Sequence, residues 1–214
     1  KGVSRIDPTN QEARTALRRL FEQTEKWNAL VEFLKEELAA LDDDVEAKVT
    51  LYEEMVRIYR DRLQLDVMVI NTFNAILQID PGNAAALDAL ATRYENAKRW
   101  NDLVGVLQRK ADRTDDPETL VPLLHRIADL WLDRFSNQGK AVPAFERILE
   151  IRTDDQEAID KLRDIFRARR DWQKLLDVSE AELDLLDANQ HGERLEEMAG
   201  IARDRLKDAD RAID

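Results

Sequence analysis

Few side chains in this sequence could hold a metal ion or carry out catalysis, and they lie far apart. The two histidines, His125 and His191, are 66 residues apart and the chain has no cysteine, so the usual tetrahedral zinc ligands are missing. The acidic pairs Glu53–Glu54 and Glu196–Glu197 are adjacent in predicted helices, where neighbouring side chains diverge by about 100°. Such carboxylates cannot converge on one bond, so we expect no catalytic residue, no bound metal and no cofactor.

Other signatures of enzymes are also missing. The sequence has no glycine-rich phosphate loop, and no serine stands in a nucleophile elbow. Three consecutive carboxylates at Asp42, Asp43 and Asp44 lie between two helical patterns, which favours helix capping, with a calcium site as the alternative. We therefore predict that the protein is not an enzyme.

The composition favours a soluble, folded chain and disfavours polyanionic partners. Apolar residues make up 43% of the 214 positions, charged residues make up 36%, and the net charge is −12. Nucleic acids and anionic membranes attract clustered lysine and arginine, whereas the basic run Arg167, Arg169 and Arg170 is interpreted as a solvated helix end. The longest aliphatic run, Val67–Ile70, is too short for a bilayer span. We expect no nucleic acid partner and no membrane insertion.

An internal repeat indicates the elements that position these side chains. Trp27, Trp100 and Trp172 are 73 and 72 residues apart. Five further columns keep a fixed offset from them and hold Ile6, Ile79 and Ile151, then Ala13, Ala86 and Ala158, then Leu17, Leu90 and Leu162, then Phe21, Tyr94 and Phe166, then Leu30, Leu103 and Leu175. The stretches between the tryptophans also repeat, with Tyr52, Met55, Ile58, Asp61 and Arg62 matching Leu124, Ile127, Leu130, Asp133 and Arg134, and a third copy at Leu195, Met198, Ile201, Asp204 and Arg205. Each unit of about 72 residues is therefore predicted to hold two helical hairpins.

Apolar residues at helical spacing, separated by stop and restart signals, predict the individual helices. The signals are Asp7–Asn10, Asp80–Asn83 with Asn83 as a cap, and Asp115–Pro117. The first helix is expected over about 10–24, the third over about 45–63, and helices five and six on either side of a turn at Ala97–Arg99.

Proline limits the start of two helices, because deep in a helix it removes a hydrogen bond and clashes with the preceding turn. Pro122 predicts that the seventh helix begins near Thr119, with a kink as the alternative, and Pro143 is placed in the first turn of the eighth. Helices nine to eleven are expected over about 155–207, broken near Asp171 and Asn189. A further half-helix is expected from Asp208.

These patterns predict an all-α chain of about 11–12 helices in a single domain, residues 1–214, with double repeats at about 1–72, 73–145 and 146–214. The chain has no start methionine or signal peptide, and it ends inside the repeat pattern, at Ala212 where Ala141 stands one unit earlier. We expect an excerpt of a longer array. The absence of cysteine permits both a reducing cytoplasm, the default, and an oxidising periplasm.

The hairpins resemble the tetratricopeptide repeat, a family whose unit is a pair of helices over 34 residues. In the copy that starts at Tyr52, the family's packing positions are held by Met55, Val56, Tyr59, Val69, Phe73, Ile76 and Pro81. The copy that starts at Leu124 has Ile127, Ala128, Trp131, Ala141, Phe145 and Ile148, and the alternate hairpin has Leu90, Ala91, Tyr94, Trp100, Leu103 and Leu107. The spacing is nearer to about 36 residues, and Leu103 replaces a small alanine. The resemblance implies a right-handed α-α superhelix, or solenoid, of antiparallel hairpins.

The resemblance also implies which side chains face a partner, because in this family the first helix of each hairpin lines a concave groove. The partner-binding candidates are Arg19, Glu53, Arg57, Arg60, Asp88, His125, Asp129, Asp160, Asp164 and Arg167. The other implied positions hold Thr15, Glu22, Thr92, Glu95, Leu132, Glu196, Gly200 and Arg203. The arginines would make the first half of the groove basic and the aspartates would make the second half acidic. Ordinary solvated charges are the alternative interpretation.

The family's lysine and asparagine pair that clamps a C-terminal carboxylate is absent from these positions, so we do not expect that activity. The tryptophans Trp27, Trp100, Trp131 and Trp172 are predicted to form the structural core between hairpins rather than to stack on a ligand.

The resulting hypothesis is a protein–protein interaction scaffold that binds a peptide or helix of mixed charge, steered by the charge gradient. Self-association through the array ends is a further possibility, since a truncated array exposes an apolar face. Two alternatives remain: an RNA-binding helical repeat, which the acidic balance disfavours, and a ligand-sensing or regulatory module of a larger protein.

Overall fold

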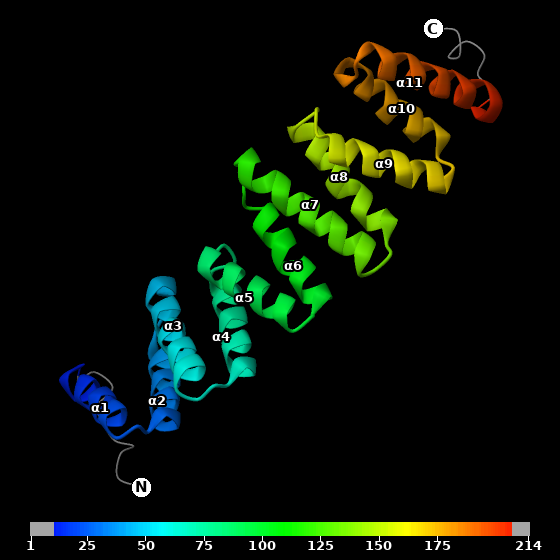
Figure 1. Ribbon diagram of the computed structural model, residues 1–214. Helices are drawn as coiled ribbons and strands as arrows, with labels where there is room; N and C mark the ends of the chain where they lie inside the picture. Colours follow the sequence, from blue (N-terminus) through cyan, green and yellow to red (C-terminus); the bar gives the residue numbers. More distant parts are fainter. Residues whose placement is uncertain (1–10, 207–214) are drawn as a thin grey trace. The chain divides into compact units, whose positions relative to one another are not determined.

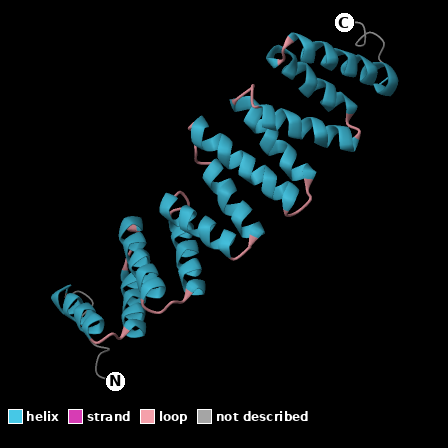
Figure 2. Ribbon diagram, viewed as in Figure 1, coloured by secondary structure: helices cyan, strands magenta, loops and turns pink. Residues whose placement is uncertain are grey.

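The computed structural model describes residues 11–206 of the chain. The expected signal at Asp7–Asn10, the column residue Ile6 and the half-helix from Asp208 through Ala212 lie outside the described residues. Within them, the chain forms eleven α-helices joined by short turns, and no strand is present (Figure 1, Figure 2). The predicted all-α class and helix number are confirmed.

By packing, the chain divides into two compact units, Lys1–Arg99 and Trp100–Asp214. The described helices of unit 1 are α1 (Gln11–Gln23), α2 (Trp27–Ala40), α3 (Val45–Asp61), α4 (Asp66–Ile79) and α5 (Ala84–Asn96). Those of unit 2 are α6 (Trp100–Ala111), α7 (Pro117–Asp133), α8 (Gln138–Ile151), α9 (Gln156–Arg169), α10 (Trp172–Glu182) and α11 (Ala188–Ile201), with a 3-10 turn η1 (Leu183–Leu185) and a π-helical segment η2 (Ala202–Leu206).

Consecutive helices within each unit form antiparallel hairpins, α1 with α2 and α3 with α4 in unit 1, and α7 with α8 and α9 with α10 in unit 2 (Figure 1). We call α1, α3, α5, α7, α9 and α11 the first helices, and the others the second helices. Trp27, Trp100 and Trp172 each begin a second helix. The predicted turn at Ala97–Arg99 is confirmed, because α5 ends at Asn96 and α6 begins at Trp100.

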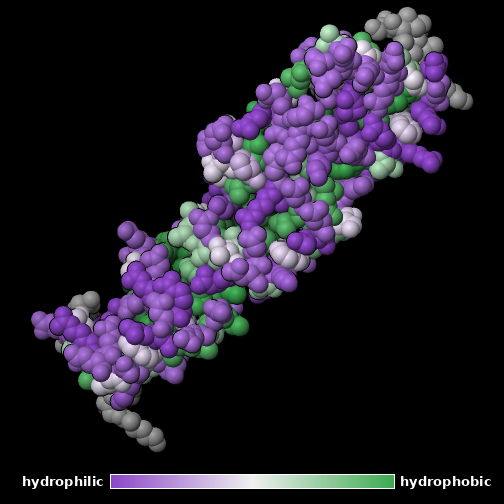
Figure 3. All heavy atoms as spheres, viewed as in Figure 1, coloured by the Kyte–Doolittle hydropathy of each residue, from purple (hydrophilic) through white to green (hydrophobic). Residues whose placement is uncertain are grey.

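The core of each unit is built from the repeating apolar columns. In unit 1, Leu30 and Leu34 of α2 pack with Met55 and Tyr59 of α3 and Val69 of α4 in one buried cluster. In unit 2, the largest fully buried side chains are Leu103, Leu107, Leu124, Ile127, Phe145, Ile148 and Phe166. Amphipathic helices bury such stripes only by stacking on their neighbours. The visible surface of the helices in Figure 3 is accordingly mostly hydrophilic.

The turns inside the hairpins share one backbone feature, a residue with a positive φ angle two positions before the second helix. Glu25, Lys98 and Arg170 each stand two residues before the tryptophan of their copy and have φ angles of 52°, 54° and 59°. Gln64 and Ser136 stand two residues before α4 and α8 and have φ angles of 54° and 49°. None of the five is glycine, so each turn carries the strain of a side chain in the left-handed region.

Helix starts follow the expected capping chemistry. The Asp44 side chain accepts a hydrogen bond from the Ala47 amide at 2.9 Å, and Asn83 accepts one from Ala86 at 2.9 Å. The capping predictions for the triple aspartate and for Asn83 are therefore confirmed.

Both proline predictions were wrong by part of a turn. With Asp116 as its N-cap, α7 begins at Pro117, and α8 begins at Gln138, so Pro122 and Pro143 are each the sixth residue of their helix. The hydrogen bonds lost are those to the carbonyls of Glu118 and Gly139, and both of these residues are exposed. Water can therefore satisfy the freed carbonyls, which lets both helices start early.

No helix in the range 11–206 combines the length and apolar character needed to cross a bilayer.

Candidate interaction surface

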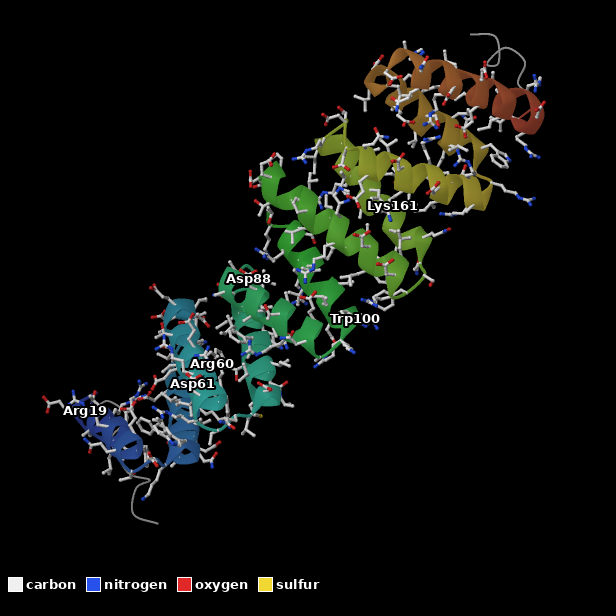
Figure 4. The ribbon with its side chains drawn as sticks, in the orientation of Figure 1. Arg19, Arg60, Asp61, Asp88, Trp100 and Lys161 are labelled. Carbon is white, nitrogen blue, oxygen red and sulfur yellow. The ribbon has the colours of Figure 1, made fainter. Side chains whose placement is uncertain are left out.

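The first helices carry the predicted partner-binding residues, and Figure 4 labels Arg19 on α1, Arg60 and Asp61 on α3, Asp88 on α5 and Lys161 on α9. One concavity beside them lies in unit 1. A cleft of about 680 Å³ is formed by the C-terminal parts of α1 and α3 over the start of α2. Its lining residues are Glu22, Gln23, Trp27, Leu30, Glu54, Arg57, Ile58, Asp61 and Arg62. We call it the Trp27 cleft.

The Trp27 cleft combines an aromatic surface with charges of both signs. The Trp27 ring is half-buried, and the guanidinium carbon of Arg62 lies 4.9 Å from its centre. The side chains of Arg57 and Glu22 are both exposed and form no side-chain hydrogen bond or ion pair among the described residues, although both lie near enough to Glu54 to act on its pKa. Two opposite charges beside an apolar surface are thus available to an incoming segment.

A partly buried carboxylate forms one wall of this cleft. Burial raises the pKa of Glu54 above its usual value, the nearby Arg18 lowers it, and the neighbouring Glu37 and Glu22 raise it further. Because burial dominates, the charged form of Glu54 is less favourable in the folded protein than in water.

Other predicted residues of unit 1 do not converge on the cleft. Arg19 lies at a separate hollow of about 310 Å³ with Glu12, Thr15 and Ala16. Glu53 is half-buried on α3, and Asp88 is exposed on α5.

Arg60 is engaged by its own neighbour. Its Nε and Nη2 donate to the two carboxylate oxygens of Asp61 at 2.7 and 3.0 Å. This hydrogen-bonded pair raises the pKa of Arg60 and lowers the pKa of Asp61. Of the three predicted arginines of unit 1, only Arg57 lines the Trp27 cleft.

In unit 2, His125 joins two helices. Its Nε2 lies 3.1 Å from Oδ1 and 3.2 Å from Oδ2 of Asp155, the N-cap of α9. Its ring meets Phe145 edge-on with 6.0 Å between centres, and its side chain is 16% exposed. The residue predicted to face a partner is therefore held in a contact between α7, α8 and α9.

Asp129, one turn further along α7, remains half-buried on the first-helix face. Burial raises its pKa, the nearby Lys161 opposes this effect, and the carboxylates Glu157 and Asp133 reinforce it. Asp129 on α7 and Lys161 on α9 are therefore neighbouring opposite charges, and Asp129 is partly shielded from water.

The remaining predicted residues belong to an ion-pair network between α9, α10 and α11. Asp160 lines a second cleft, of about 580 Å³, whose walls are Gln156, Asp160, Glu182, Leu185, Leu186, Gln190, Glu193, Arg194 and Glu197. We call it the Glu182 cleft. Arg167 is bound by Glu197 of α11 and approaches Asp164 at 3.5 Å. Asp164 and Arg167 are thus partners of each other within the first-helix face.

The four tryptophans lie half-buried at helix ends instead of deep in the core, and each has a cation over its ring. The cation-to-ring distances are 4.9 Å for Arg62 on Trp27, 4.7 Å for Arg134 on Trp100, 4.3 Å for Lys140 on Trp131 and 5.4 Å for Arg205 on Trp172. The column that holds Arg62, Arg134 and Arg205 repeats in the sequence, yet sequence reasoning gave it no role. The sequence did contain a signal for these contacts, because an arginine column recurs together with the tryptophan column.

The described residues hold no cluster of three or more histidine, cysteine, aspartate or glutamate side chains that could bind a metal ion.

The chain was compared with protein families, curated proteins and solved structures. No family model matches the chain, and no curated protein matches it. Among solved structures, a protein called MamA is similar at 14% identity over 78% of this chain and 92% of that one, with a TM-score of 0.40. The pilF protein of Pseudomonas aeruginosa is similar at 16% identity over 94% and 88%, with a TM-score of 0.40. A tetratricopeptide repeat protein from Parabacteroides merdae is similar at 14% identity over 94% and 75%, with a TM-score of 0.39.

At such identities and scores these likenesses carry no argument about function. The class follows from the chain itself, in which helical hairpins recur and their packing columns fall on buried positions. Between residues 11 and 206, the chain is an all-α array of helical hairpins whose pattern resembles that of the tetratricopeptide repeat.

Proposed function

We propose that the protein is a protein–protein interaction scaffold that binds a partner segment on its first-helix face, with the Trp27 cleft as the principal anchor. The observation that carries this proposal is the exposure of Arg57 and Glu22 on the walls of a 680 Å³ cleft floored by Trp27, Leu30 and Ile58. Aromatic and arginine side chains in a pocket are the usual source of binding energy at protein interfaces.

The chemistry of the cleft indicates the partner. A carboxylate would pair with Arg57, a lysine or arginine would pair with Glu22, and an apolar side chain between them would contact Trp27. A helix or extended peptide with alternating charge supplies all three within a few residues. Arg60 and Arg167 add less than the sequence suggests, because Asp61 and Glu197 already neutralise them.

The experiment is a binding comparison between wild type, a variant with reversed cleft charges and a control variant. The double variant Glu22→Lys with Arg57→Glu reverses both cleft charges, and Arg113→Glu on an exposed residue outside the cleft is the control. We expect a partner captured from the source cell to be retained by wild type and the control and lost by the double variant, with all three melting alike. Equal capture by the double variant would exclude the Trp27 cleft as the anchor.

A photo-crosslink identifies contact directly. A benzoylphenylalanine in place of Gln23, which lines the cleft, should link to the partner, whereas the same residue in place of the exposed Gln78 on α4 should not. Recovery of RNA instead of protein on the Gln23 variant would favour the nucleic acid alternative, as would retention of RNA on a filter at low salt.

A further inference from the structure

An arginine in unit 1 bridges two carboxylates on two other helices. Arg18 of α1 donates through Nη1 to Oε2 of Glu54 on α3 at 2.9 Å, and through Nη2 to Glu37 on α2. The Glu37 side chain is only 7% exposed. Arg14, one turn earlier on α1, donates to the other oxygen of Glu37 at 2.7 Å. Three consecutive helices are therefore joined through one guanidinium group.

Unit 2 contains the same arrangement. Arg163 of α9 donates through Nη2 to Oε2 of Glu197 on α11 at 3.0 Å, and its Nη1 lies 3.4 Å from Oε2 of Glu182 on α10. The Glu182 side chain is 1% exposed. Arg194 of α11 supplies the second cation and donates to Oε1 of Glu182 at 3.2 Å. Again one arginine links a first helix, its second helix and the next first helix.

The two arrangements occupy equivalent repeat positions. Arg18 and Arg163 stand nine residues before their tryptophans, and Glu37 and Glu182 stand ten residues after them. Glu54 and Glu197 each follow by two residues the aligned pair Tyr52 and Leu195. We call each set of one arginine and two glutamates a triad.

The middle copy lacks the triad. Its equivalent positions hold Ala91, Lys110 and Arg126, which provide two cations and no carboxylate, so these residue types cannot form it. The division of the chain into compact units, between Arg99 and Trp100, falls inside this copy. Each unit therefore contains one complete triad, and the copy without one coincides with their boundary.

From this coincidence we infer that the triads are positioning devices: Arg18 and Arg163 hold three successive helices of their unit as one cooperative block, and the array divides where the triad is missing. The planar guanidinium can bind two carboxylates at once, which a lysine ammonium cannot do with the same geometry. Removing the arginine would leave Glu37 or Glu182 as a buried charge with less compensation, which strongly destabilises its surroundings.

The same triads shape the two clefts. Glu54 lines the Trp27 cleft, and Glu182 and Glu197 line the Glu182 cleft. The cleft walls are thus fixed before any partner arrives, which reduces the entropy lost on binding. The inference itself rests on the fold and stands independently of the proposed binding function.

Hydrogen exchange measured by mass spectrometry on the whole chain tests the triads. Arg18→Met should raise amide exchange in α1, α2 and α3 by about tenfold or more and leave unit 2 unchanged, because local opening is confined to one cooperative block. Arg163→Met should do the reverse, in α9, α10 and α11. The matched controls are Arg19→Met and Arg169→Met, which remove exposed arginines of the same two helices.

A conservative variant separates bridging from charge. Arg18→Lys keeps the positive charge but loses the fork, so it should fall between wild type and Arg18→Met in exchange of the α3 amides. Equal protection in Arg18→Lys and wild type would show that charge alone suffices and would overturn the bridging role. A rise in exchange that spreads equally over both units, or that the controls reproduce, would overturn the assignment of one block to each triad.

Discussion

The guanidinium carbon of Arg134 lies 4.7 Å from the centre of the Trp100 ring, and the equivalent pairs of the neighbouring copies repeat this contact at 4.9 Å and 5.4 Å. In each copy the tryptophan begins a second helix. Arg62 and Arg134 directly follow α3 and α7, and Arg205 lies in η2, which follows α11. The exposed face of each half-buried tryptophan is therefore covered by a cation, which explains why a large aromatic side chain can remain at the surface of the repeat.

The pair Arg134 and Trp100 should contribute measurably to stability. In a double-mutant cycle of Arg134→Ala and Trp100→Leu, we expect a coupling free energy of about 0.5–1 kcal/mol, the range for cation–π pairs at exposed sites. Unfolding by denaturant, followed by tryptophan fluorescence and circular dichroism, measures it. Arg113→Ala paired with Trp100→Leu is the control and should give additive effects. Additivity for Arg134 as well would mean that the stacked geometry contributes nothing.

Much of the fold could be predicted from the sequence, because repeat columns report burial directly. Leu30, Leu103 and Leu175 occupy one column, and all three are at most 1% exposed. The start of α7 at Pro117 was not predicted from the sequence, since whether Pro122 is tolerated inside the helix depends on the solvent exposure of a carbonyl four residues earlier. That exposure is a property of the packed array and has no local sequence signal.

The candidate surface could be predicted only in part. The repeat positions placed Arg57 and Glu22 on the correct helices, but pairing depends on tertiary distances. His125 meets Asp155 across 30 residues, and Arg167 meets Glu197 across 30 residues. An aligned repeat position indicates that a side chain faces away from the core. It does not indicate which neighbouring side chain pairs with it.

The partly buried carboxylate of Glu54 should make stability depend on pH. Because burial raises the pKa of Glu54 in the folded state above its unfolded value, the folded protein binds the proton more tightly. Its contribution to the free energy of unfolding is therefore present in full below the unfolded pKa and is lost as pH rises through the raised folded pKa. Glu54→Gln should remove this pH dependence. Denaturant titrations between about pH 4 and 7, which cover the usual pKa of a glutamate and the range above it, would detect the difference.

The variant Glu53→Gln, at a half-buried residue one position earlier on α3, is the control for that experiment. It should leave the pH profile of wild type unchanged, since its side chain diverges from that of Glu54 by about 100° around the helix and does not line the cleft. A Glu54→Gln profile that runs parallel to wild type would show that the Arg18 contact offsets the burial of the carboxyl.

Replacing Lys98, whose backbone is left-handed, with glycine should stabilise the protein. Its φ of 54° carries a strain of about 1–2 kcal/mol for a residue with a side chain. Lys98→Gly removes that strain but adds about 0.4–1 kcal/mol of entropy to the unfolded chain. We expect a net rise in the free energy of unfolding of about 0.5–1 kcal/mol. Ala97→Gly, at a neighbouring φ of −80°, should instead destabilise, and a gain at both positions would argue against relief of strain.

The contact between His125 and Asp155 distinguishes a structural residue from a partner-binding one. His125→Ala should lower the free energy of unfolding by about 1–2 kcal/mol, because it removes a part-buried hydrogen bond and the edge contact with Phe145. The Asp155 side chain still caps α9 through the Ala158 amide at 3.0 Å, so the helix itself should persist by circular dichroism. Partner capture should be unchanged, in contrast to the reversed pair at Glu22 and Arg57. Loss of capture with an unchanged melting temperature would instead make His125 part of the binding surface and would show that its contact with Asp155 opens when the partner binds.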